Sequence, residues 1–201
     1  MKFMKVPNQR KRSLVECANL PVMNIENREH FAVKLEHISV VPSVLRDEAE
    51  KYKQFDKEEG FPRVIWFGYE CEYRAMIFTL LGPSLDDLFN YCSRKFSLKT
   101  VLMLADQLIC RIEHIHSKGI IHRDIKPENF LMGVGKYGTT VYVTDLGIST
   151  EYDNVMREPD TYPRRNGPLI GTARFASIRG HSGVGERCST TTIVHTMSAD
   201  L

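Results

Sequence analysis

The stretch 121–131 carries residue types that chemistry on phosphate groups requires. Asp124 can accept the proton of an attacking hydroxyl group, and Lys126 can neutralise charge on a phosphoryl group during its transfer. Asn129 and, further along the chain, Asp145 offer the hard oxygen atoms that Mg²⁺ prefers as ligands. The sequence therefore predicts a magnesium-assisted phosphoryl-transfer site.

Two short strands are predicted to position the metal ligands. Residues 131–132 and 141–144 are typical of strands, and the segment 133–138 between them carries the glycines of a turn. Asn129 precedes the first strand and Asp145 follows the second, so their side chains are expected at neighbouring ends of a hairpin. A single metal ion could contact both.

An earlier strand and helix could bind a nucleotide. Residues 31–36 alternate as in a strand with one buried face, which places Ala32 and Lys34 on the same face. This arrangement suits a nucleotide whose base lies against Ala32 and whose phosphates lie at Lys34. In the helix that follows Ser43, Glu48 borders the apolar stripe and could reach this lysine. The alternatives are an exposed lysine and a solvated acid. The apolar stripe consists of Leu45, Ala49, Tyr52 and Phe55.

Periodicity and capping residues predict the remaining elements. Residues 63–69 and 73–81 are typical of two antiparallel strands around a polar turn. Ser84 begins a helix with a capping box, and Ser97 begins a longer helix that Gly119 ends. The apolar residues of the longer helix recur at helical spacing, which predicts that this helix lies in the core. They are Leu98, Val101, Leu102, Ala105, Leu108, Ile109, Ile112 and Ile115.

Composition bounds the class of protein. The 201 residues are 42% hydrophobic and 26% charged, as in an ordinary soluble protein of one or two domains. The formal net charge of +2 gives no reason to expect a nucleic-acid or membrane surface, and no signal peptide is expected. The five cysteines are widely spaced, which predicts reduced thiols and a cytoplasmic or nuclear location.

Taken together, the motifs resemble those of the eukaryotic protein kinases. They occur in the expected order along the chain: Lys34, Glu48, His122-Arg123-Asp124 with Asn129, and Asp145-Leu146-Gly147. Within that superfamily, four stretches resemble the casein kinase I family, namely 80–85, 93–101, 130–133 and 171–178. The resemblance covers about residues 24 to 181. An unrelated α/β domain with chance motifs is the remote alternative.

This resemblance implies an α+β, protein-kinase-like two-lobe fold that is incomplete. A small antiparallel β-sheet lobe with one helix would be followed by the first half of the mainly helical large lobe. The implied organisation is an unassigned segment 1–22, a partial small lobe 23–81, a partial large lobe 82–181 that runs through the activation segment, and a divergent tail 182–201.

The implied activity is that of a serine/threonine protein kinase, which transfers the γ-phosphoryl group of MgATP to protein hydroxyl groups. Lys34 would bind the ATP phosphates and pair with Glu48, Asp124 would be the catalytic base, and Lys126 would assist at the γ-phosphate. The implied Mg²⁺ ligands are Asn129 and Asp145, and the implied adenine contacts are Ala32, Leu81 and Leu131.

The family favours protein substrates with acidic or already phosphorylated residues near the target. Arg174 matches part of the anion site that reads this preference. The family's usual lysine seven residues earlier is Gly167 here, with Arg164 and Arg165 as nearby substitutes. Neither a nucleic acid nor a membrane is implied as a partner.

Two departures from the family pattern leave a second functional interpretation open. No glycine precedes Gly60, so the family's glycine-rich phosphate loop is not expected. After His181 the sequence departs from the family pattern, in which a central helix supports the large lobe. This departure predicts a large lobe of marginal stability, whose exposed apolar faces a chaperone or partner would cover. The alternative function is a catalytically inactive homologue that acts as a binding or decoy module.

Overall fold

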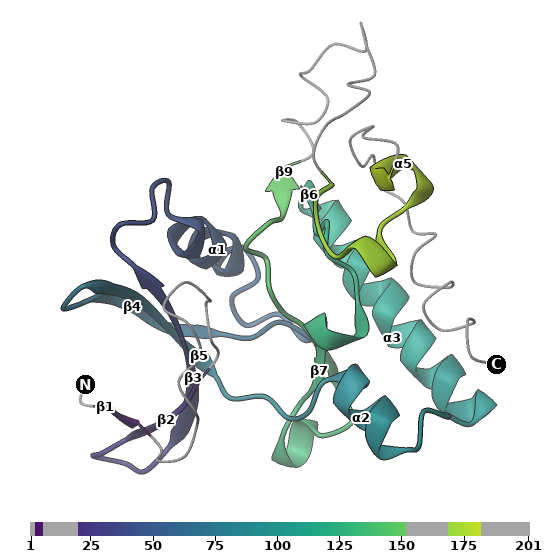
Figure 1. Ribbon diagram of the computed structural model, residues 1–201. Coiled ribbons are helices and arrows are strands. Elements are labelled where there is room, and N and C mark those ends of the chain that lie inside the picture. Colours follow the sequence, from purple (N-terminus) through teal and green to yellow (C-terminus); the bar gives the residue numbers. More distant parts are fainter. Residues whose placement is uncertain (1–2, 6–19, 152–168, 182–201) are drawn as a thin grey trace, which may run out of the picture. The chain divides into compact units, whose positions relative to one another are not determined.

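The computed structural model describes residues 3–5, 20–151 and 169–181, and the chain forms two compact units, Met1–Leu81 and Gly82–Leu201 (Figure 1). The first unit is a five-stranded antiparallel sheet with the strand order β1-β2-β3-β5-β4. Its strands are β1 (Phe3–Lys5), β2 (Leu20–Asn24), β3 (His30–His37), β4 (Val64–Glu70) and β5 (Tyr73–Thr79).

Helix α1 (Val44–Lys53) packs on one face of this sheet. Ser43 caps it by accepting a hydrogen bond from the backbone N–H of Arg46, as is typical of an N-cap. The predicted inward stripe is confirmed, because all four of its residues are buried. Phe55, just after the helix, stacks on Phe61 with ring centroids 4.2 Å apart. The predicted pair of strands 63–69 and 73–81 is confirmed as β4 and β5, with small shifts at the ends.

Strand β3 departs from the prediction of one buried and one exposed face. Val33 lies in an apolar cluster with Val22, Ala75 and Ile77 on one face of the sheet. The other face is also buried, because Lys34 and Glu36 are paired with opposite charges instead of being solvated. Pairing makes the burial of these charges tolerable.

Residues 1–22 carry no assignment from the sequence, yet they contain β1 and the first part of β2. Strand β2 pairs with β3, so that Val22 lies opposite Phe31. Most of the segment in which a glycine-rich loop would be expected, residues 6–19, lies outside the described residues.

In the residues that the structure describes, the second unit contains two main helices and two small sheets. The capping box predicted at Ser84 is present at the start of α2 (Leu85–Tyr91), and Ser97 caps α3 (Leu98–Ser117). The sheets pair β6 (Ile120–Ile121) with β9 (Thr150–Glu151), and β7 (Phe130–Met132) with β8 (Val141–Val143). The short helices are η1 (Pro127–Asn129), η2 (Gly135–Tyr137), η3 (Ala173–Phe175) and α5 (Ile178–His181).

The prediction that all apolar residues of α3 lie in the core is wrong. The buried residues are Leu104, Leu108, Ile112 and Ile115. Leu98, Leu102 and Ile109 are 64%, 60% and 47% exposed. The helix carries two apolar stripes roughly a quarter turn apart, and only one packs against described parts of the unit. Among the described helices, none is both long and apolar enough to cross a lipid bilayer.

Candidate functional site

A buried histidine ties the loop after β6 to the end of β8. The ring of His122 is fully buried, its Nδ1 accepts a hydrogen bond from the backbone N–H of Asp124 (3.2 Å), and its Nε2 lies 3.0 Å from the carbonyl oxygen of Thr144. Because Nδ1 accepts, we assign the proton to Nε2, which donates to Thr144. Burial lowers the pKa of His122, so the ring is neutral at pH 7.

The hairpin of β7 and β8 brings the two predicted metal ligands to neighbouring strand ends. Phe130 pairs with Val143, and both the N–H and the hydroxyl of Thr144 donate to the carbonyl oxygen of Asn129, at 2.9 and 3.1 Å. Asn129 therefore lies directly beside Thr144, and Asp145 is the next residue. The predicted hairpin is confirmed.

The carboxylate of Asp124 lies at the centre of a dense hydrogen-bond network. Its Oδ2 accepts from Lys126 Nζ at 2.7 Å and from Asn129 Nδ2 at 3.1 Å. Its Oδ1 accepts from the backbone N–H and the hydroxyl of Thr172, at 2.9 and 2.8 Å. Burial raises the pKa of Asp124, but the hydrogen bonds from Lys126 and Thr172 outweigh it, so the net pKa is lowered. Asp124 is ionised at neutral pH.

Thr172 is a member of this network that sequence reasoning missed. It lies 48 residues after Asp124, and its hydroxyl also accepts from Lys126 Nζ at 2.9 Å. Gly171 makes the approach possible: its φ is +86°, and a Cβ there would collide with the carbonyl oxygen of Arg123. The only signal in the sequence is that both residues fall in the motif 171–178, whose resemblance assigns them no role.

The donor atoms around Asn129 and Asp145 fit Mg²⁺. The Asn129 amide nitrogen donates to both the backbone oxygen and the carboxylate of Asp124, so its amide oxygen is the atom suited to a metal. Among the described residues, no three His, Cys, Asp or Glu side chains converge as a protein-only metal cage would require. One carboxylate and one amide are typical of Mg²⁺ that takes its other ligands from phosphates and water.

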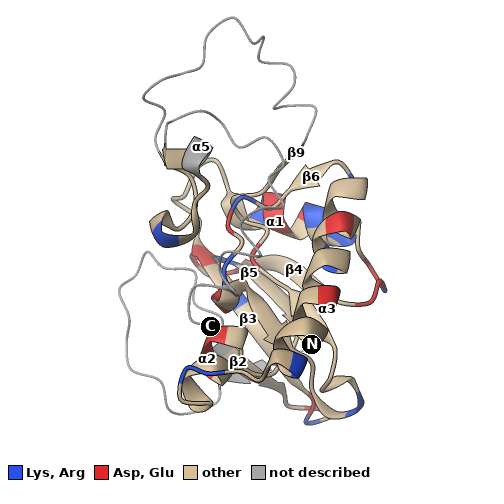
Figure 2. Ribbon diagram, turned by 90° about the vertical axis from the view of Figure 1, so that its right-hand side faces the viewer, with Lys and Arg blue, Asp and Glu red and all other residues tan. Residues whose placement is uncertain are grey.

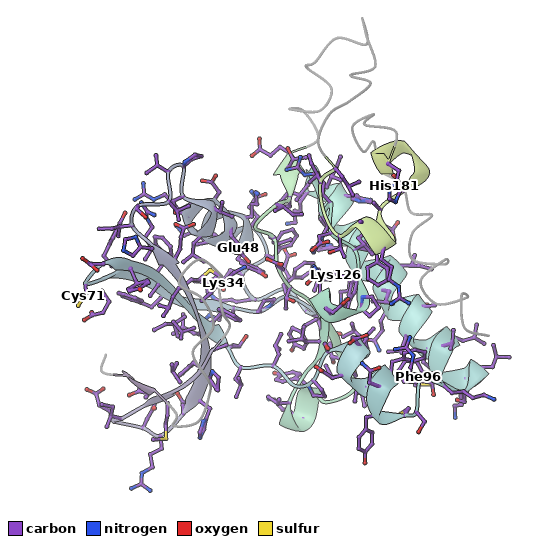
Figure 3. All side chains as sticks on the ribbon, in the orientation of Figure 1. Lys34, Glu48, Cys71, Phe96, Lys126 and His181 are labelled. Atoms are coloured by element: carbon purple, nitrogen blue, oxygen red, sulfur yellow. The ribbon has the colours of Figure 1, made fainter. Side chains whose placement is uncertain are left out.

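In the first unit, Lys34 and Glu48 point toward each other from β3 and α1 (Figure 3). Lys34 Nζ lies 2.7 Å from Glu48 Oε2, and both side chains are buried. An exposed lysine and a solvated acid, the alternative interpretations, are therefore wrong. Ala32 is buried on the same strand, two residues before the lysine.

The other two predicted adenine contacts, Leu81 and Leu131, belong to different units. Leu81 is the last residue of the first unit and is partly buried. Leu131 belongs to β7 of the second unit, is also partly buried, and forms a β-bridge with Ser84. Their contact with adenine stays a prediction.

A second buried ion pair, also missed by sequence reasoning, fixes the start of α1. Arg74 Nη1 donates to Glu36 Oε2 at 2.9 Å and to the carbonyl oxygens of residues 37 and 40. Glu36 also accepts from the hydroxyl of Ser43 (2.6 Å) and the backbone N–H of Leu45 (3.0 Å). Burial raises the pKa of Glu36, but the hydrogen bonds from Ser43, Leu45 and Arg74 outweigh this effect. The net pKa of Glu36 is therefore below its usual value. One carboxylate thus joins β5, β3 and the first turn of α1.

Arg174, the predicted anion-binding residue, is exposed in η3, where its guanidinium carbon lies 5.5 Å from the centre of the Phe175 ring. Arg164, Arg165 and Gly167 lie outside the described residues.

Comparison with models of protein families identifies the family to which these residues belong. Residues 20–172 match the model of the protein kinase domain, which is about three quarters of the chain. The match includes every predicted site residue except Arg174. The predicted fold class is confirmed: an α+β protein-kinase fold, incomplete, with an antiparallel sheet and one helix in the small lobe and part of the helical large lobe. The chain belongs to the protein kinase family.

Proposed function

We propose that the chain is a serine/threonine protein kinase of the casein kinase I type, which transfers the γ-phosphoryl group of MgATP to protein hydroxyl groups. The observation that carries the proposal is the ionised, buried carboxylate of Asp124, which a cation, an amide and a hydroxyl hold in place. A preorganised group of this kind needs no rearrangement at the moment of reaction.

The chemistry assigns one role to each group. The substrate hydroxyl oxygen attacks the γ-phosphorus, the bond to the β–γ bridging oxygen breaks, ADP leaves, and the hydroxyl proton passes to Asp124. Lys126 stabilises the negative charge of the phosphoryl group in transit. Lys34, held by Glu48, binds ATP phosphates. Mg²⁺, bound by Asn129 and Asp145, would neutralise charge on the phosphates.

Thr172 supports a preference for serine and threonine. Its aliphatic hydroxyl donates to Asp124 at 2.8 Å and accepts from Lys126 at 2.9 Å. A serine or threonine substrate would offer the same type of group to the same carboxylate. One further role rests on resemblance: Ala32, Leu81 and Leu131 would contact adenine.

The exposed guanidinium of Arg174 supports a preference for acidic or phosphorylated substrates, because it is a permanently charged cation two residues from Thr172. Peptides that differ only in a glutamate, phosphoserine or glutamine before the target serine test this preference. Arg174→Gln should raise KM for the acidic and phosphorylated peptides and leave kcat unchanged. An equal rise in KM for all three peptides would show that Arg174 does not recognise the acidic or phosphorylated residue.

The transfer itself is tested with the purified 201-residue chain, labelled ATP, Mg²⁺ and an acidic protein substrate. Asp124→Asn is the matched control, since it keeps the shape of the side chain and removes the base. Transfer by the intact chain and loss of about 10²–10⁴-fold in the variant is the expected result. Equal transfer by both proteins would indicate a contaminating kinase and refute the proposal.

The inactive binding module is favoured by one observation, the absence of glycine before Gly60. Loss of a single transition-state donor typically costs about 10²–10³ in rate, and a glycine-rich loop supplies several. The two functions differ in a paired measurement. A rise in melting temperature with millimolar MgATP, without any transfer, would support the binding module and exclude the kinase.

A further inference from the structure

Tyr69 places an exposed hydroxyl group beside two arginines. The residue lies near the end of β4, an outermost strand of the sheet, and is 53% exposed. Arg46 of α1 donates a hydrogen bond to its hydroxyl oxygen. Arg74 lies directly opposite Tyr69 in the register of β4 and β5, so both side chains are on one face of the sheet. Interaction with Arg74, and to a smaller extent with Arg46, lowers the pKa of the Tyr69 hydroxyl. Both arginines therefore stabilise negative charge at this oxygen.

One donor of Arg74 is unused. Its Nη1 and Nη2 donate to Glu36 and to backbone carbonyl oxygens. Its Nε is buried and has no hydrogen-bond partner among the described residues. A buried N–H group without an acceptor lowers stability. The neutral hydroxyl of Tyr69 leaves this donor unpaired, whereas a charged group with several oxygen atoms on the same side chain would supply an acceptor.

Charges elsewhere on the chain give no general preference for an anion. The formal net charge is only +2, and Figure 2 shows lysines and arginines interspersed with aspartates and glutamates over the described residues. Attraction for an anion at Tyr69 therefore comes from the two neighbouring arginines. A phosphate group suits them, because arginine N–H groups form short, charge-assisted hydrogen bonds with phosphate oxygens.

Tyr69 is also accessible to a modifying enzyme. In the described sheet β4 pairs only with β5, so its outer edge offers extended backbone to another protein. The hydrogen bond from Arg46 joins two exposed residues, and such pairs contribute little, so the hydroxyl is released at small cost. Exposed Glu70 and Glu72 follow the tyrosine and give a basic substrate groove a segment of opposite charge.

We propose that Tyr69 is a phosphorylation site for a separate protein tyrosine kinase, and that Arg46 and Arg74 hold the resulting phosphate. The Tyr69 hydroxyl oxygen attacks the γ-phosphorus of ATP, the bond to the β–γ bridging oxygen breaks, ADP leaves, and the phenolic proton passes to a base of that enzyme. The phosphate carries a charge of about −1.5 to −2 at neutral pH and three acceptor oxygens. Arg46 keeps its contact, and Arg74 Nε gains an acceptor.

The modification strengthens the connection between the sheet and α1. Because neither Glu36 nor the carbonyl oxygens use Arg74 Nε, the phosphate binds Arg74 without displacing them. Arg46 joins the same phosphate to the first turn of α1. Helix α1 also carries Glu48, which holds Lys34, so a firmer α1 should tighten MgATP binding. This second effect rests on the proposed function.

The first test is whether Tyr69 accepts a phosphate. The full 201-residue chain is incubated with MgATP and a purified tyrosine kinase that prefers acidic substrates, and the phosphorylated residues are mapped by mass spectrometry. Tyr69→Phe should lose one phosphate and keep the others. A chain that is phosphorylated at Tyr91, which is 87% exposed, but never at Tyr69 would exclude the site.

The second test measures what the phosphate does. A chain with phosphotyrosine incorporated at position 69 during translation is compared with the unmodified chain. We expect the urea midpoint of the first unit, followed by the fluorescence of Trp66, to rise by about 0.5 M. The dissociation constant for MgATP should fall about threefold.

Two controls separate the arginine contacts from a general effect of charge. Tyr137 is similarly exposed, at 48%, but lies in the second unit, so phosphotyrosine at position 137 should change neither measurement. With phosphotyrosine at position 69, Arg46→Met should remove about half of the shift in midpoint. Added salt at about 1 M should reduce the shift as well, because the contact of Arg46 is exposed.

The two measurements fail separately. An unchanged or lower midpoint with phosphotyrosine at position 69, or equal shifts for positions 69 and 137, would refute the binding of the phosphate by the two arginines. A higher midpoint with unchanged MgATP affinity would refute only the link to nucleotide binding. If neither form binds MgATP, the proposed function fails, while the midpoint still decides whether the arginines hold the phosphate.

Discussion

At the scale of single residues, the site depends on how closely the backbone at Gly171 approaches Asp124. Gly171→Ala should displace Thr172 from Asp124, because the new Cβ collides with the carbonyl oxygen of Arg123 and lies 3.4 Å from Asp124 Oδ1. We expect phosphoryl transfer to fall at least tenfold, with a loss of stability beyond the cost of the positive φ alone, which is about 1–2 kcal/mol. Steady-state kinetics and urea denaturation measure the two effects.

Gly119→Ala is the matched control for this prediction. Gly119 has a similar φ of +72°, but nothing lies within 4 Å of the position of its Cβ. The control variant should show the cost of the positive φ and keep its activity. If both variants lose activity equally, the contact between Gly171 and the Asp124 loop is not what matters.

The Lys34–Glu48 ion pair gives a prediction about stability in the first unit. Lys34→Met leaves the Glu48 carboxylate buried without its cation, which should destabilise the unit by about 3–5 kcal/mol. The double variant Lys34→Met/Glu48→Met removes both charges and should recover most of that loss. Urea denaturation followed by the fluorescence of Trp66 reports on this unit. Additive losses in the double variant would mean that the two charges do not interact.

Some of these interacting residues could be predicted from the sequence, and others could not. Lys34 and Glu48 could be paired in advance, because strand alternation and helical spacing place each on a definite face. Thr172 could not be found, since its contact with Asp124 joins two irregular segments that have no periodicity. Arg74 and Glu36 were also missed, because charges on alternating strand positions look the same whether they are solvated or paired.

At the scale of elements, the connection between β3 and α1 depends on Arg74. Arg74→Met removes the cation from buried Glu36 and the donors to the carbonyl oxygens of residues 37, 38 and 40. The first turn of α1, which Glu36 holds, should loosen and carry Glu48 with it. We expect destabilisation of about 3 kcal/mol and roughly tenfold weaker MgATP binding. Denaturation and nucleotide titration measure these effects.

The control for Arg74 lies in the same unit. Arg46 also forms a hydrogen bond, to the hydroxyl of Tyr69, but both residues are exposed. Exposed pairs contribute little, so Arg46→Met should change neither stability nor nucleotide binding measurably. A loss of nucleotide affinity in Arg46→Met that matches the loss in Arg74→Met would show that any arginine near α1 matters. The contacts of Arg74 with Glu36 and the carbonyl oxygens would then have no special role.

The elements themselves were largely predictable, whereas their burial was not. Ser84 and Ser97 were predicted to begin α2 and α3, and a helix was predicted after Ser43; all three serines cap their helices, an interaction that is local in sequence. The apolar spacing of α3 gave a helix but could not say which of its two stripes is covered. Burial depends on parts of the chain that are distant in sequence, and for α3 it left a surface stripe where a core was predicted.

At the scale of the whole molecule, the two units should respond differently to acid. In the second unit, burial lowers the pKa values of His122 and His116 below their usual 6.5, so unfolding takes up protons and stability falls once the pH drops below about 6.5. In the first unit, hydrogen bonds from Ser43, Leu45 and Arg74 lower the pKa of Glu36, whose stabilisation is complete above its usual pKa of 4.5 and is lost as pH falls through the lowered value. Trp66, the only tryptophan, reports on the first unit, and far-UV circular dichroism is dominated by α3. Between pH 7 and 5 the denaturation midpoint measured by circular dichroism should fall, while the midpoint measured by fluorescence stays constant. Below pH 4.5, Glu36→Gln should weaken the pH dependence of the fluorescence midpoint only. Midpoints that fall together from pH 7 would contradict this separation of the two units.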